Sequence, residues 1–249
     1  MIELDLPAGS LVLTDLHVDG EDEQQRRAFA DLLDRASEAP VLLILGDLFE
    51  YWLGPSQATS PGGRGLLDTL AAFPGRVHLV PGNRDVLAGG EVEAVLAGPL
   101  LWHGCVGRLP DGRRVAFLHG DELCLADRSY QRLRRVLRSG PVRGLLRSLP
   151  GFMGHGLARR LRRRSTAAVA AKAPLEVAQD ATEAARRLDG TGAGLLVVGH
   201  THAFREVDLP GGGRLVVLDA QGGDRDLARI TPEGLEFSAS AALPDPTRG

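Results

Sequence analysis

The chain has 249 residues, of which 43% are hydrophobic and 24% charged, so it can bury a globular core and is neither fibrous nor disordered. Its net charge of -3 excludes nothing by itself, but its two cysteines are too few for a disulfide framework and fit a reducing compartment. The sequence shows no opening signal segment and no apolar run long enough to span a bilayer, so we expect a soluble, cytoplasmic protein.

The first part of the chain alternates short apolar runs with amphipathic segments. Phe29, Leu32 and Leu33 recur at helical spacing before Pro40, which predicts a helix, while short apolar runs closed by Gly or Asp predict buried strands. In chain order we expect a strand and turn over 2–19, a helix over 21–39, a strand over 41–45, a helix near 64–73, a strand over 76–81, a helix near 90–97, and strands near 100–102 and over 114–118.

Beyond Asp127 the composition changes. Residues 128–164 contain twelve arginines and no acidic residue, and leucines recur among the arginines. This pattern predicts two or three short amphipathic helices, which we interpret as a helical cap, residues 127–173, inserted into one domain of residues 1–240. After the cap we expect a helix over 176–188, a strand over 194–198, antiparallel strands within 203–237, and a frayed end over 238–249 that includes a tail over 241–249.

Five polar blocks each follow an apolar run directly. They are Thr14-Asp15-Leu16-His17, Gly46-Asp47, Gly82-Asn83-Arg84-Asp85, His119-Gly120-Asp121 and Gly199-His200-Thr201-His202. Because α/β proteins place their chemistry where strand ends converge, we expect these blocks to meet along one rim of a sheet. So many Asp, Asn and His side chains exceed the ligands of one zinc ion and suit two ions such as Mn, Fe or Zn. A pair of such ions favours hydrolysis of a phosphoester or pyrophosphate.

The blocks resemble those of the calcineurin-like metallophosphoesterase superfamily. The motifs D-x-H, G-D, G-N-x-D, H-G-D and G-H-T-H occur in the family's order over residues 15–202. The resemblance implies an α/β fold, a sandwich of two sheets flanked by helices. It also implies that one metal ion is held by Asp15, His17 and His202, that the other is held by Asn83, His119 and His200, and that Asp47 bridges the two.

Arg84 stands where most members of the superfamily carry a histidine. Together with Gly46-Asp47-Leu48-Phe49-Glu50-Tyr51-Trp52 and His119-Gly120-Asp121-Glu122-Leu123-Cys124, the G-N-R-D block resembles the UDP-2,3-diacylglucosamine diphosphatases of lipid A biosynthesis. That family cleaves the pyrophosphate, usually with Mn, to UMP and 2,3-diacylglucosamine 1-phosphate. Arg84 stays protonated and cannot act as a general acid, but it can hold the diphosphate and stabilise charge in the transition state. Arg84 and Asp47 are therefore the expected catalytic residues.

The same resemblance assigns substrate contacts. From the core they are Asn83, Arg84 and His200, and from the cap they are Asp127, Tyr130, Arg162, Ser165 and Lys172, the last being the only lysine of the chain. Three stretches depart from the family pattern, namely Val169, Ala203-Phe204 and Asp219-Ala220-Gln221. These departures keep open an alternative, a related metallophosphoesterase that acts on another nucleotide diphosphate or phosphodiester. A binding module without activity on the same scaffold is a further alternative.

Several interpretations near the blocks stay open. Phe49, Tyr51 and Trp52 either line the site or pack in the core, and Arg84 could instead form a salt bridge to a neighbour such as Asp85. Asp121 is expected to orient a ligand rather than to bind a metal ion itself. The leucines interleaved with arginines favour a cap that lies peripherally on the anionic, cytoplasmic face of the inner membrane, and they disfavour a nucleic-acid partner.

Overall fold

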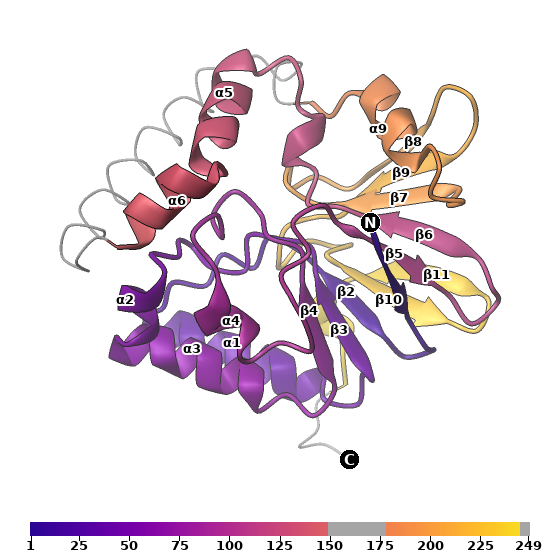
Figure 1. The fold of residues 1–249 in the computed structure, drawn as a ribbon. Coiled ribbons are helices and arrows are strands. Elements are labelled where there is room, and N and C mark those ends of the chain that lie inside the picture. The colour runs from indigo at the N-terminus through magenta and orange to yellow at the C-terminus, as the bar shows by residue number, and fades with distance from the viewer. Residues whose placement is uncertain (149–177, 245–249) are drawn as a thin grey trace.

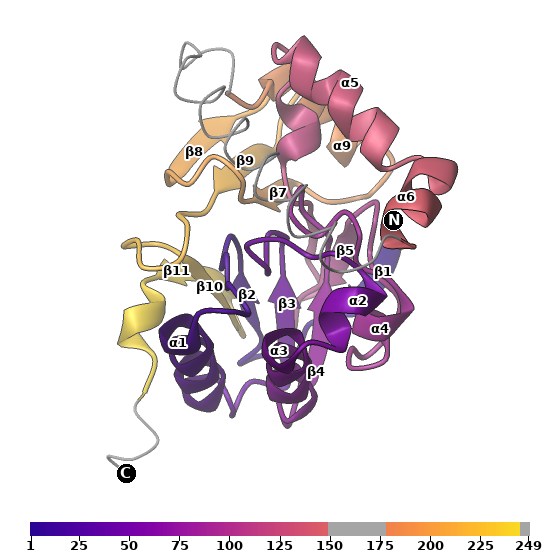
Figure 2. The same cartoon turned by 90° about the vertical axis from the view of Figure 1, so that its left-hand side faces the viewer.

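The computed structural model describes residues 1–148 and 178–244. Two sheets pack face to face and helices cover both outer faces (Figures 1 and 2). The two-sheet α/β sandwich that the sequence indicates is therefore confirmed. Within the described ranges, no helix combines the length and the hydropathy that crossing a membrane requires.

One sheet has five strands in the order β11-β10-β2-β3-β4. Its strands β2, β3 and β4 run parallel, while β10 runs antiparallel to both β2 and β11. The bounds are β2 Leu11–Leu13, β3 Val41–Ile44, β4 Arg76–Leu79, β10 Leu227–Thr231 and β11 Gly234–Ser238. Every residue of β2 and β3 is buried, as expected for strands that are covered on both faces.

The other sheet has six strands in the order β1-β5-β6-β7-β9-β8. Strands β6, β7 and β9 run parallel to each other, whereas β5 and β8 run antiparallel to their neighbours β6 and β9. The bounds are β1 Ile2–Asp5, β5 Cys105–Arg108, β6 Arg114–Phe117, β7 Leu195–Val198, β8 Arg205–Asp208 and β9 Arg214–Val217.

Alternate residues of each strand pack into different layers of the core. Leu11 and Leu13 belong to the cluster beneath the helices α1 (Glu23–Arg35) and α3 (Pro61–Ala71), whereas Val12 belongs to the cluster between the sheets. On the other sheet, Leu196 faces helix α9 (Ala181–Leu188) and Val197 faces the first sheet. The period-two alternation of strand side chains thus produces four layers, with the two sheets in the middle.

Helices α1 and α3 each begin directly after a residue whose side chain caps the helix N-terminus. Asp22 accepts hydrogen bonds from two backbone N–H groups at the start of α1, and Ser60 caps α3 with Pro61 in the first helical position. The remaining helices are short: α2 Pro55–Ala58, α4 Gly90–Glu93, α5 Arg128–Leu137 and α6 Gly140–Arg147, with 3-10 turns η1 Asp121–Leu123 and η2 Ser240–Ala242. Helices α5 and α6 are the start of the expected cap, and residues 149–173 of that cap lie outside the described residues.

The structure corrects several boundaries. Residues 100–102 are not a strand, because the chain turns there with a hydrogen bond from Gly104 N–H to the Leu101 carbonyl, and the strand is β5. Residues 2–19 contain two strands, and these belong to different sheets. Helix α9 begins only after its cap Asp180. The end is not frayed throughout, since Leu243 is buried and its carbonyl accepts from Arg35 of α1.

Candidate metal centre

The five polar blocks meet at one end of the sandwich, and two sheets contribute to the same rim. Strands β2, β3 and β4 of one sheet lead into Asp15, Asp47 and Asn83. Strands β6 and β7 of the other sheet lead into His119 and His200. The blocks meet at a single rim, as expected, but two sheets form this rim rather than one. The parallel strands of each sheet end on the same side of the sandwich, which brings the blocks together.

Backbone strain is concentrated at these strand ends. Within the described residues, every non-glycine residue with a positive φ is an expected metal ligand: Asp15, His17, Asp47, His200 and His202, with φ between 48° and 74°. The left-handed region is disfavoured for residues that carry a Cβ, and such strain concentrates at active sites. The turns that these residues form aim carboxylate and imidazole groups at a common point.

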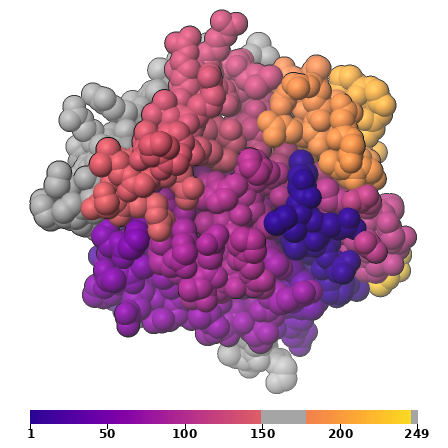
Figure 3. Space-filling view, viewed as in Figure 1, coloured from indigo at the N-terminus to yellow at the C-terminus, as the bar shows by residue number. Residues whose placement is uncertain are grey.

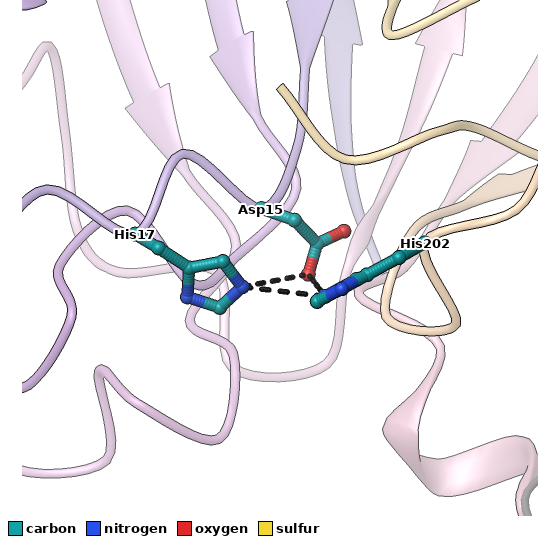
Figure 4. Close-up of side chains that lie close together, drawn as sticks. All are labelled: Asp15, His17 and His202. Carbon is teal, nitrogen blue, oxygen red and sulfur yellow. Dashed lines mark hydrogen bonds and ion pairs between the residues drawn. The ribbon is translucent and has the colours of Figure 1, made fainter. Parts of the chain in front are cut away.

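Asp15, His17 and His202 form the first cluster (Figure 4). One oxygen of Asp15, Oδ2, accepts from the Thr14 hydroxyl and from the His200 backbone N–H, each at 2.8 Å. The other, Oδ1, lies 3.3 Å from His202 Nε2 and 3.9 Å from His17 Nε2. The two Nε2 atoms are 3.2 Å apart.

Asn83, His119 and His200 form the second cluster. His119 donates from Nδ1 to the Leu45 carbonyl at 2.7 Å, which leaves Nε2 to face Asn83 Oδ1 at 3.3 Å. The ring centroids of His119 and His200 are 5.0 Å apart. Asp47 lies between the clusters, with Oδ1 3.6 Å from His119 Nε2 and Oδ2 4.0 Å from His17 Nε2.

These donor atoms fit divalent cations. Asp15 Oδ1 is buried and, apart from the approach of His202 Nε2 at 3.3 Å, has no hydrogen-bond partner among the described residues, although an under-satisfied buried carboxylate oxygen is costly. Imidazole nitrogens and carboxylate oxygens converge on the same space, and that donor set is the one that Mn, Fe and Zn take. Two groups of these donors lie close enough to share a cation, namely Asp15, His17 and His202, and Asp15, Asp47 and His119. The assignment of Asn83 and His200 to a second ion, with Asp47 as the bridge, stays a prediction.

The electrostatics at the centre separate four of the titrating ligands into two kinds. Burial lowers the pKa of His17 to about 3, and burial together with the charge of His119 lowers that of His200 to about 4. Burial raises the pKa of Asp47 to about 7, and the charges of Asp47 and Asp15 raise the pKa of His119 to about 9 although burial opposes them. His17 and His200 are thus ready to ligate at neutral pH, while the Asp47–His119 pair retains a proton that a cation must displace.

Glycines in the blocks permit close approach of the ligands. A Cβ on Gly82 would lie 2.2 Å from Asp47 Oδ1, and one on Gly199 would lie 2.4 Å from Asp15 Oδ2. No larger residue fits at either position unless the ligand itself moves. Gly82 and Gly199 are therefore part of the site's packing.

Arg84 is held beside the centre, but not by Asp85. Its Nη1 donates to Glu50 Oε1 at 2.9 Å, and its backbone N–H donates to Asp47 Oδ1 at 2.8 Å. Asp85 instead accepts from the backbone N–H groups of Leu48, Phe49 and Gly82. Arg84 therefore does form a salt bridge to a neighbour, but the partner is Glu50. Asp85 is the wrong partner, because its carboxylate is occupied by three loop amides.

The aromatic residues after Asp47, which were expected either to line the site or to pack in the core, do not share one environment. Phe49 and Trp52 are fully buried members of the cluster beneath α1 and α3, with ring centroids 4.3 Å apart, so they pack in the core. Trp52 also donates from Nε1 to Glu91 at 2.9 Å. Tyr51 is partly exposed at the edge of this group.

The expected cap contacts have structural partners of their own. Asp127 caps α5 by accepting from the Tyr130 backbone N–H at 3.0 Å, and the Tyr130 hydroxyl donates to Asp121 at 2.7 Å. Asp121, which we expected to orient a ligand, also accepts from Arg134 at 2.6 Å, so its described contacts hold the cap helix. The other expected cap residues, Arg162, Ser165 and Lys172, and the departure at Val169 lie outside the described residues.

Two residues near the site were not anticipated from the sequence. Glu50 holds Arg84, and Gln179 donates to the Gly199 carbonyl at 2.9 Å beside the last block. Glu50 follows Asp47 closely within one block, which was a usable signal. Gln179 stands alone before α9, and no pattern pointed to it.

Comparisons with known proteins agree with this geometry. Residues 10–204 match the family model described as calcineurin-like phosphoesterase. A UDP-2,3-diacylglucosamine hydrolase of Pseudomonas savastanoi pv. phaseolicola is 40% identical over 196 residues, which cover 77% of this chain and 78% of the relative. The hydrolase of the same name from Pseudomonas aeruginosa is 38% identical over 213 residues, covering 81% and 85%.

Solved structures are more distant. A dimetal phosphatase from Danio rerio covers 93% of this chain and 96% of its own, at 15% identity and a TM-score of 0.48, so the assignment relies on the sequence relatives instead. The chain belongs to the calcineurin-like phosphoesterase family, and its curated relatives within that family are UDP-2,3-diacylglucosamine hydrolases.

Proposed function

We propose that this protein is a hydrolase that cleaves the pyrophosphate of UDP-2,3-diacylglucosamine to UMP and 2,3-diacylglucosamine 1-phosphate, a step in lipid A biosynthesis. The observation that carries the proposal is the convergence of five strand ends, where Asp15, His17, Asp47, His119 and His202 lie close enough together to hold divalent ions. The substrate is inferred from the relatives, which are UDP-2,3-diacylglucosamine hydrolases.

The ligand groups have distinct roles in the proposal. Asp15, His17 and His202 would hold one divalent ion and Asn83, His119 and His200 would hold the other, with Asp47 lying near both groups. Bound divalent ions, of which Mn is our first choice, supply an activated water and neutralise charge on the phosphoryl oxygens. Overall, the water oxygen adds to one phosphorus while the bond from that phosphorus to the bridging oxygen breaks.

Arg84 binds the diphosphate in this proposal. Its side chain is 26% exposed and is held by Glu50, so part of the guanidinium faces the open site. Arginine donates in a fixed planar geometry that suits phosphate oxygens, and it stabilises charge that develops on them. No general acid is required, because the departing phosphate monoester is already a weak base. Asn83 and His200 are proposed to contact the substrate as well.

The first test is UMP release from UDP-2,3-diacylglucosamine by metal-stripped protein, measured with and without added Mn. We expect release only with the metal ion, and slower release from an unacylated UDP-sugar because the acyl chains contribute binding. Equal or faster hydrolysis of the unacylated compound would reject the lipid substrate. Protein that binds no metal and hydrolyses no bis-p-nitrophenyl phosphate would reject catalysis altogether.

A second candidate is hydrolysis of another nucleotide diphosphate or phosphodiester. It is favoured by the loop after His202, where the family pattern is absent. There the Phe204 backbone N–H donates to Asp219, and the Arg225 guanidinium lies 4.4 Å above the Phe204 ring. Metal-dependent hydrolysis of a generic phosphodiester, without UMP release from the lipid substrate, would favour this candidate.

We also propose that the cap meets an anionic membrane surface on the cytoplasmic side. Helices α5 and α6 bury no hydrophobic residue, and Leu133, Val136 and Leu145 are 46%, 54% and 65% exposed. The two helices lie at the surface of the molecule (Figure 3). Exposed leucines beside Arg132 and Arg135 suit acyl chains and anionic headgroups, which a protein acting on a lipid substrate encounters.

A further inference from the structure

Glu50 lies between a metal ligand and the phosphate-binding arginine. It is 8% exposed, and its backbone N–H donates to the Val18 carbonyl at 3.0 Å. The Val18 N–H in turn donates to the Leu48 carbonyl, and the His17 N–H to the Asp47 carbonyl, both at 2.9 Å. This short parallel pairing places Glu50 beside His17 independently of any side-chain contact.

One carboxylate oxygen of Glu50 holds Arg84. Oε1 accepts from Arg84 Nη1 at 2.9 Å, and the Glu50 carbonyl lies 3.4 Å from the same nitrogen. Arg84 in turn donates its backbone N–H to Asp47 and accepts, through its carbonyl, from the Trp52 N–H. The guanidinium is therefore oriented mainly by Glu50, since Asp47 Oδ2 is more distant at 3.8 Å.

The second carboxylate oxygen faces His17. Glu50 Oε2 lies 3.9 Å from His17 Nδ1, which is an ion-pair distance rather than a hydrogen bond. The opposite ring nitrogen, Nε2, is the one that faces Asp15 and His202. His17 Nδ1 is buried, and no described residue forms a hydrogen bond with it.

A histidine that binds metal through one nitrogen generally donates its other N–H to a carboxylate or carbonyl, which sets the tautomer and the ring orientation. His119 satisfies this rule through the Leu45 carbonyl at 2.7 Å. For His17, the carboxylate that lies near Nδ1 is that of Glu50, and their 3.9 Å separation would have to shorten to form the hydrogen bond.

We infer that Glu50 is a positioning residue that serves both halves of the site: it accepts the Nδ1 proton of His17 and thereby orients that ligand, and it holds the guanidinium of Arg84 for the diphosphate. The inference rests on the proposed two-metal function and adds a residue to it. The orientation of His17 and the orientation of Arg84 therefore both depend on the Glu50 carboxylate.

The test compares Glu50→Ala and Glu50→Gln with Glu183→Ala. Glu183 is a matched control, because it is also 8% exposed and pairs with arginines, Arg186 and Arg187, on α9 away from the site. Mn binding to metal-stripped protein is followed by calorimetry and by competition with a chelator, and KM and kcat are measured separately. Thermal unfolding of each metal-free variant monitors the fold.

We expect Glu50→Ala to weaken the binding of one of two ions by roughly 10–100-fold and to raise KM. Glu50→Gln keeps an acceptor oxygen for His17 but presents no negative charge to Arg84. Its metal affinity should therefore be close to that of the wild type, whereas its KM should stay almost as high as in Glu50→Ala. Glu183→Ala should change neither quantity. Wild-type affinity for both ions in Glu50→Ala, or an equal loss in Glu183→Ala, would overturn the inference.

Wild-type protein that binds two ions but releases no UMP would instead reject the proposed substrate, and the metal readout for Glu50 would stand.

Discussion

At the scale of single residues, Asp47 is the position on which the two clusters depend. Its two oxygens face His119 and His17, and its φ is 49°. Asp47→Asn is the informative change, because Asn tolerates the left-handed region whereas Ala would add strain. We expect protein that binds one ion in place of two, with turnover reduced beyond the roughly 10–100-fold typical of outer-shell changes.

Metal content by elemental analysis and turnover with saturating Mn test this prediction. The control is the unfolding temperature of the metal-free variant. It should not fall, because burial disfavours the charged carboxylate in the metal-free fold. Retained pairing of ions in Asp47→Asn would show that Asp47 does not bridge them.

Arg84 should matter for turnover and little for metal content. Its guanidinium contacts Glu50 and approaches Asp47, but it occupies no position in either ligand cluster. We expect Arg84→Ala to lower kcat by about 100–1000-fold, the range seen when one charge-stabilising donor is removed. Arg84→Lys keeps the charge but not the planar donors, so it should recover only part of the loss. Loss of bound Mn in Arg84→Ala would instead make Arg84 structural.

The Asp47–His119 pair predicts how metal binding depends on pH. In the metal-free protein the pKa is raised to about 7 for Asp47 and to about 9 for His119, so these groups keep protons to higher pH than usual. A cation must displace those protons, and its apparent affinity therefore rises with pH and levels off once the pair is deprotonated. We expect about a tenfold rise per pH unit for each displaced proton, measured by Mn titration from about pH 6 to about pH 9. An Mn affinity that does not change with pH would contradict proton retention by the Asp47–His119 pair. The Asp47→Asn variant should show a weaker dependence of Mn affinity on pH than the wild type.

At the scale of elements, the strand ends were predictable and their partners were not. Apolar runs such as 41–45 and 195–198 followed by Gly and Asp or His are local signals, and the five blocks met as expected. Residues 100–102 have the same apolar character, but a turn at Gly104 with φ 73° diverts them, and no short-range pattern records that packing. Glu50 as the partner of Arg84 depends on the pairing of 48–50 with 17–18, which only the folded chain reveals.

Helix α5 is held to the core by polar side chains. Gln131 donates to the Asp121 carbonyl at 2.7 Å, Arg134 donates to its carboxylate at 2.6 Å, and Arg138 donates to the Pro81 carbonyl at 3.1 Å. With Tyr130, these residues recur at helical spacing and form one face. Asp121 is fully buried, so removing a side chain that donates to its carboxylate would leave a buried charge without that partner, which is costly.

Tyr130→Phe separates two roles for this tyrosine. If its hydroxyl serves Asp121, the change removes a hydrogen bond to a charged group and should lower the free energy of unfolding by about 1.5–3 kcal/mol, with KM nearly unchanged. Denaturant unfolding and steady-state kinetics measure the two effects. A several-fold rise in KM at unchanged stability would show that the hydroxyl contacts the substrate, as the family resemblance implies.

At the scale of the whole molecule, the site lies where two sheets end and the described part of the cap lies across the same end (Figures 1 and 2). Helix α6 reaches the chain just after Arg84: Arg143 donates to the Val86 carbonyl at 3.0 Å, and Arg147 pairs with Glu91 at 2.6 Å. Arg134, Arg138, Arg143 and Arg147 thus turn toward the core, whereas Leu133, Val136 and Leu145 are exposed. The cap helices are amphipathic as predicted, with the polar face toward the core.

This orientation predicts membrane binding that depends on the outer face of the cap. We expect a variant combining Leu133→Ser, Val136→Ser and Leu145→Ser to lose most of its binding to anionic phospholipid vesicles, because each change removes exposed apolar area that would insert among acyl chains. Hydrolysis of a soluble phosphodiester should stay at the wild-type rate, since none of these side chains is buried against the site. Ile2→Ser is the matched control, because Ile2 is 49% exposed on β1 and lies outside the cap. Vesicle cosedimentation at low and high salt measures the effect, and equal losses for the cap variant and the Ile2 control would contradict a membrane-facing cap.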